Sequence, residues 1–190
     1  MLLSREELAE VMKIANKCSY NGRKFKTVDE LNPDIISHAL RTYARGCSRD
    51  KVIGICDTTL YCLANNESET EGFLLSEDAL YSNYFIFNYM CKGETNSHGL
   101  PIHGISQITS SDSANRYLNV FYKDGSIREK VDNNIFKDMV GTLLTEIMKK
   151  EKQKEGEKKK EEGLEIPEQE APEHADYELN FLVFLKRVGF

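Results

Sequence analysis

The chain has 190 residues, of which 40% are hydrophobic and 29% are charged, and its formal net charge is -6. This length suits one domain with extensions. The acidic balance argues against nucleic acid as a ligand, because phosphate binding depends on clustered Lys and Arg side chains. A membrane span is not expected either, because no apolar run reaches the roughly 20 residues that cross a bilayer.

Residues 1–50 predict two amphipathic helices that form an N-terminal helical extension. Ser4 and Glu7 have the spacing of a capping box, and apolar residues at helical spacing follow as far as Cys18. A second helix is expected to begin at Pro33, because proline fits the first helical position. Neither helix is long enough to be stable alone, so both are expected to pack on the segment that follows.

From Lys51 the apolar pattern becomes alternating, which predicts β-strands. Asp124 and Gly125 form a two-residue turn that is typical of a β-hairpin. The expected strands are 52–56, 60–63, 72–76, 79–82, 84–90, 102–109, 116–122 and 126–131. Such short, closely spaced strands predict an antiparallel sheet, barrel or sandwich. A long amphipathic helix is expected to begin at Asn133 and to cover the strands with its apolar stripe.

Residues 51–150 resemble the bacterial version of the pleckstrin-homology-like (PH-like) domain superfamily. The resemblance rests on the order and spacing of Asp57-Thr58-Thr59, of 72–78 with 80–81, of 105–109, of 118–122 with 124–125, and of the helix from Asn133. It implies an α+β fold, in which a PH-like antiparallel β-barrel is capped by a C-terminal amphipathic helix and preceded by the two N-terminal helices. It also implies a binding scaffold without shared catalytic machinery.

The sequence departs from the PH-like pattern at two places. Its first loop is long and acidic, with Glu67, Glu69 and Glu71, where the superfamily has a short loop of small residues. Ser76 also stands where threonine is expected, which keeps the hydroxyl group. Acidic side chains would repel the phosphates of a phosphoinositide, so lipid binding through this loop is not expected.

Two further segments follow residue 150. Residues 151–176 are charged and low in complexity, and we expect a solvated linker whose first part could extend the preceding helix through Glu–Lys pairs. Residues 177–190 are strongly apolar. They could dock on the same domain as an edge strand or short helix, be presented to a partner, or lie on a membrane surface.

The N-terminus and the cysteines predict a cytoplasmic location. The chain opens with M-L-L-S-R-E-E-L and lacks the basic and apolar regions of a signal peptide. Its five cysteines have no C-x-x-C spacing, which is typical of reduced thiols.

No catalytic, metal or cofactor site is predicted. His98, His103 and Cys91 lack the close paired spacing of zinc ligands. Cys56 and Cys62 lie in apolar strands, which would keep their thiols protonated. We interpret the Asp57-Thr58-Thr59 motif as side chains that tie down the backbone at a strand end.

The expected function is therefore non-catalytic binding of another protein, by strand addition at a sheet edge or in the groove between barrel and capping helix. Aromatic side chains provide the candidate partner-binding residues, although alternate strand members could instead fill the core. These residues are Tyr84, Phe85, Phe87, Tyr89, Phe181 and Phe184. Two alternatives stay open: an acidic inhibitor or immunity-type protein that blocks a basic enzyme, and a small hydrolase-type enzyme that uses His98, His103 and Asp57.

Overall fold

A computed structural model describes residues 2–19, 22–58, 72–82, 99–110, 117–124, 128–132 and 137–162. The chain divides into two compact units, Met1–Glu155 and Gly156–Phe190. Several predicted features lie outside the described residues and stay predictions. They include the strands 60–63 and 84–90, the acidic loop, the turn at Gly125 and the helix start at Asn133. The six aromatic partner-binding residues and the apolar segment 177–190 also lie there: Tyr84, Phe85, Phe87, Tyr89, Phe181 and Phe184.

Both predicted N-terminal helices are present. Helix α1 (Arg5–Ala15) begins with the predicted capping box, in which the Glu7 backbone N–H donates to Ser4 Oγ at 3.3 Å and the Ser4 N–H donates to Glu7 Oε2 at 2.6 Å. A short 3-10 helix, η1 (Asn16–Cys18), continues it. Helix α2 (Pro33–Arg41) begins with proline after the Asn32 cap. The sequence therefore encodes the starts of both helices locally.

Replacing Ser4 with alanine is expected to lower the free energy of unfolding by about 1 kcal/mol, the usual value of a side-chain N-cap. The variant loses the acceptor for the Glu7 backbone N–H. Urea denaturation measures the change, and Ser4→Thr, which keeps the hydroxyl, serves as the control. Equal stability of Ser4→Ala and wild type would contradict a contribution from this cap.

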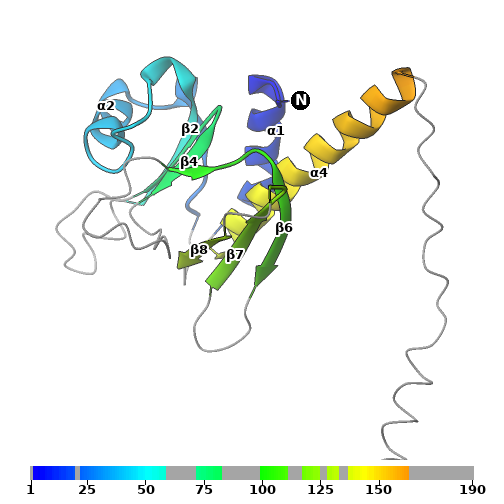
Figure 1. Ribbon diagram of the computed structural model, residues 1–190. Coiled ribbons are helices and arrows are strands. Elements are labelled where there is room, and N and C mark those ends of the chain that lie inside the picture. The colour runs from blue at the N-terminus through cyan, green and yellow to red at the C-terminus, as the bar shows by residue number, and fades with distance from the viewer. Residues whose placement is uncertain are drawn as a thin grey trace, which may run out of the picture. The chain divides into compact units, whose positions relative to one another are not determined.

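The strands form two antiparallel sheets (Figure 1). The five-stranded sheet has the order β1 (Lys26–Thr27), β2 (Val52–Asp57), β3 (Gly72–Ser76), β4 (Ala79–Ser82), β5 (Leu100–Pro101). The three-stranded sheet has the order β6 (Ile105–Ser110), β7 (Tyr117–Tyr122), β8 (Arg128–Asp132). Short 3-10 helices η2 (Val28–Glu30) and η3 (Arg49–Lys51) precede α2 and β2.

These elements confirm the predicted α+β class with antiparallel strands. The described strands do not close into a barrel, because the two sheets remain separate hydrogen-bonded units. Strands β1 and β5, of two residues each, were not predicted, and the strand expected over 102–109 begins only at Ile105. Strand β1 pairs with Ile55 and Gly54 of β2, a long-range contact that no local sequence pattern indicates.

Hydrophobic clusters lie on both faces of the five-stranded sheet. The main core lies between this sheet, the three-stranded sheet, α1 and α4, and it takes Phe73 and Leu75 from β3. The α2 core lies on the opposite face, which helix α2 covers (Figure 1), and it includes Leu74 and Tyr81. Burial of each large apolar side chain contributes roughly 1.5–3 kcal/mol. The central strands are therefore buried on both sides.

Helix α4 (Lys137–Glu161) is the long amphipathic helix that the sequence predicts. Met139, Val140, Leu143, Leu144 and Ile147 are buried in the main core. The helix continues through the charged run, so residues 151–161, expected as the first part of a solvated linker, are helical. None of the helices in the described part of the chain combines the length and the hydrophobicity needed to span a membrane.

Candidate functional site

Asp57 and His103, two of the three residues of the hydrolase hypothesis, do not converge. Asp57 pairs with Gly72 at the first residue of β3, whereas His103 contacts Glu77, which follows the last. At about 3.3 Å per residue, β3 separates these positions by roughly 16 Å. His98, the third residue, lies outside the described residues. Asp57 ends β2 and the adjacent Thr58 is buried, and the structural role of this motif stays a prediction.

His103 is hydrogen-bonded through both ring nitrogens. It occupies the turn between β5 and β6, where Gly104 has a positive φ of 71°. Nδ1 lies 2.6 Å from Glu151 Oε1, and Nε2 lies 2.6 Å from the backbone carbonyl oxygen of Glu77. The Gly104 N–H donates to the other Glu151 oxygen at 3.2 Å. Neither ring nitrogen is thus left to act as a base toward a substrate.

The hydrogen-bond partners of His103 indicate which of its ring nitrogens carry a hydrogen. A carbonyl oxygen only accepts, so Nε2 carries a hydrogen, and an ionised carboxylate only accepts, so Nδ1 carries one as well. Burial lowers the pKa of His103, but the hydrogen bonds to Glu151 and to the Glu77 carbonyl, with the charges of Glu151 and Asp78, outweigh it. The pKa therefore lies above its ordinary value of 6.5.

Glu151 is a buried acid at the end of the apolar stripe of α4. It follows Ile147 by four residues, so it faces the same side of the helix, and its side chain is only 6% exposed. Sequence reasoning placed this residue in a solvated linker and missed it. The signal was the spacing from Ile147, which continues the stripe into the charged run.

The cysteine thiols of the strands and of the α2 core are not activated. Burial raises the pKa of Cys56 to about 12. Burial also raises the pKa of Cys47 to about 11, against a lowering hydrogen bond from Ser76. Cys18 is exposed, with its Sγ 3.4 Å from Thr142 Oγ1, and Cys62 and Cys91 lie outside the described residues. Among the residues that the structure describes, no group of three or more His, Cys, Asp or Glu is placed to hold a metal ion.

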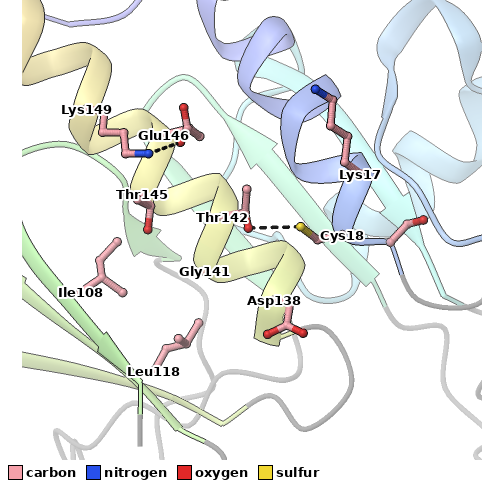
Figure 2. Close-up of a pocket in the computed structure, with 11 residues that line it drawn as sticks. Lys17, Cys18, Ile108, Leu118, Asp138, Gly141, Thr142, Thr145, Glu146 and Lys149 are labelled. Carbon is pink, nitrogen blue, oxygen red and sulfur yellow. Dashed lines mark hydrogen bonds and ion pairs between the residues drawn. The ribbon is translucent and has the colours of Figure 1, made fainter.

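An open groove of about 880 Å³ runs across the half-exposed face of α4. We call it the α4 groove. Figure 2 shows Ile108 of β6 and Leu118 of β7 on one side of the helix, and Lys17 and Cys18 of η1 on the other. Thr142 and Thr145 are among the α4 residues that line it. The groove therefore joins a sheet, a long helix and the N-terminal extension.

The lining of the α4 groove is mixed in polarity. Ile108 and Leu118 provide apolar side chains, whereas Lys17 and Asp138 provide opposite charges. Glu146 and Lys149 form an ion pair at 2.6 Å, so their own charges neutralise each other. Such a lining suits a polypeptide with both apolar and polar groups better than a small apolar molecule.

Among the strands that the structure describes, β6, beside this groove, lies at the edge of its sheet. In the described part of the chain it pairs with β7 and with no other strand. An edge strand presents backbone N–H and C=O groups that another extended chain can pair with. The sequence predicted strand addition as a mode of binding, but it could not indicate which edge lies beside the helix.

Comparison of the chain with protein-family models, with curated proteins and with solved structures gave no match in any of the three.

Proposed function

We propose that the protein is a non-catalytic binding module that recognises an extended segment of another protein in the α4 groove, by strand addition to β6. The observation that supports the proposal most directly is the coincidence of an edge strand with an open groove that the same strand lines through Ile108. An added strand would pair its backbone with β6 and direct alternate side chains toward α4.

We also propose that residues 51–150 form a PH-like domain. The support is the order of the elements, since antiparallel strands are followed by one amphipathic helix whose apolar stripe packs against them. In such a scaffold, a groove between an edge strand and the final helix suits a polypeptide ligand. The proposed PH-like assignment and the proposed binding mode are thus mutually consistent.

Selection from a random peptide library on the full chain tests the binding mode. We expect enrichment of extended peptides with alternating apolar residues, and we expect Thr145→Arg, which fills the groove, to weaken the selected peptide at least about tenfold, equivalent to 1.4 kcal/mol. Gln107→Arg is the matched control, because Gln107 lies next to Ile108 in β6 but is exposed and does not line the groove.

Backbone N-methylation of the selected peptide separates strand addition from simple groove binding. Methyl groups on the edge that faces β6 should abolish binding, whereas methyl groups on the opposite edge should leave it intact. Equal effects on both edges would contradict strand addition. A strong fall in affinity with salt would instead favour the acidic-inhibitor hypothesis, because screening weakens charge-driven association.

A further inference from the structure

We propose that His103 and Glu151 form a proton-dependent latch that fixes α4 to the turns after β3 and β5. The latch consists of the His103 ring, the Glu151 carboxylate, the Glu77 carbonyl group and the Gly104 N–H. It joins three elements that are distant in sequence. His103 is 48 residues from Glu151 and 26 residues from Glu77.

The two hydrogen bonds of the His103 ring require that the ring is protonated. When His103 is protonated, each ring N–H faces an oxygen acceptor at 2.6 Å. A neutral ring has only one N–H, so it can donate to the Glu151 carboxylate from Nδ1 or to the Glu77 carbonyl oxygen from Nε2, but not to both. At the other nitrogen a lone pair would face an oxygen, and acceptor would oppose acceptor. Loss of the proton therefore breaks one of the two contacts through which His103 ties the turn after β3 to α4.

Burial makes this loss costly. The Glu151 side chain is 6% exposed and the His103 side chain is 18% exposed, so water cannot readily replace the lost partner. A buried oxygen that loses its donor is unfavourable, and more so when it is charged. Separation of α4 from the turn after β3 avoids that cost and would release the adjacent turns of α4. The latch is thus a two-state element rather than a rigid support.

The neighbouring charges do not supply a replacement. From the turn after β3, Glu77 is paired with Arg5 of α1 at 2.5 Å, and Asp78 is paired with Lys51 at 2.5 Å. The turn after β7 contributes Lys123, which is paired with Glu155. On α4 itself, Lys150 and Lys154 are paired with the acids of α1, Glu10 at 3.0 Å and Glu7 at 2.6 Å. Each of these charges already has a partner of opposite sign, and histidine is the only side-chain type among them with an ordinary pKa between pH 5 and 8, so His103 is the group that switches.

The direction of the effect follows from the raised pKa of His103. The stabilisation is fully present below the ordinary value of 6.5 and is lost as the pH rises through the higher value of the folded protein. Within that window the protection of α4 amides should fall by up to about tenfold per pH unit. Acid pH closes the latch, and alkaline pH opens it.

Amide hydrogen exchange of the full chain, followed through residues 147–155 over a pH series and expressed as protection factors, tests the latch. The informative variant is Glu151→Gln, because its amide N–H can donate to a neutral Nδ1 while its oxygen still accepts from Gly104. Its protection should be independent of pH across the window. His38→Gln, which alters a histidine of α2, is the control and should retain the wild-type dependence.

Titration of the His103 ring by NMR in the wild-type chain gives a second readout that depends on no variant. We expect a pKa above 6.5. A titration at or below that value would overturn the proposal, and so would a Glu151→Gln variant that keeps the pH dependence of the wild type. Both readouts are made on the chain without any ligand, so they do not depend on what the α4 groove binds.

Discussion

Replacing His103 with leucine is expected to lower the free energy of unfolding by about 3–5 kcal/mol at neutral pH, the cost of breaking a buried ion pair from one side. The Glu151 carboxylate would stay buried and would keep only the Gly104 N–H as a partner. Urea denaturation measures the change. The loss should be larger than for Glu151→Leu, because a neutral His103 can still donate from Nε2 to the Glu77 carbonyl.

The double variant His103→Leu, Glu151→Leu separates the cost of an unpaired charge from the value of the pair. Leucine at position 151 would continue the apolar stripe after Ile147, so the double variant should recover part of the stability that His103→Leu loses, while the Gly104 N–H and the Glu77 carbonyl lose these partners. It should also lose the pH dependence. If the double variant were as unstable as His103→Leu alone, the leucine side chains would not fit the site and the electrostatic explanation would be wrong.

Replacing Gly54 with alanine is expected to lower the free energy of unfolding by about 3 kcal/mol, at the upper end of the usual cost of overpacking. A Cβ atom at Gly54 would lie 2.5 Å from the backbone oxygen of Lys26 and 2.7 Å from the sulfur of Met12. The methionine side chain can move, but the strand β1 carbonyl cannot move without breaking the pairing of β1 with β2. The variant should therefore loosen the N-terminal segment from the five-stranded sheet.

Gly141→Ala is the matched control for this prediction. The nearest atoms to a Cβ there are the methyl carbons of Leu118 at 3.5 Å, an ordinary contact, and the position lies within α4. Alanine should stabilise the helix by up to about 1 kcal/mol. Opposite signs for the two variants in thermal or urea unfolding are the expected result. A Gly54→Ala variant as stable as wild type would contradict the close approach of β1 and α1 to β2.

The sequence predicted the elements whose signals are local. Ser4 with Glu7 marked the start of α1, Pro33 marked the start of α2, and the apolar stripe marked α4. It did not predict how the strands are partitioned, because the division into two sheets depends on pairings between distant segments. The unbroken apolar run Phe73-Leu74-Leu75 was a clue, since a strand with one wet face would alternate.

The functional residues were harder to predict than the fold. Glu151 was read as part of a solvated run, because its neighbours Lys150 and Lys152 are charged and its partner His103 is far away in sequence. The α4 groove was equally hidden, because it is assembled from η1, β6, β7 and α4. Composition indicates which side chains are available, but only the tertiary arrangement determines which of them meet.

The α2 core has a consequence for where this protein can be cut. A chain shortened to begin at Lys51 would uncover Val52, Ile55, Leu74 and Tyr81, which now pack against α2. This exposed apolar surface would bind other copies of the fragment. A chain that lacks the first fifty residues should therefore aggregate. The N-terminal helices thus belong to the same compact unit as the strands, and a search for a minimal fragment has to retain them.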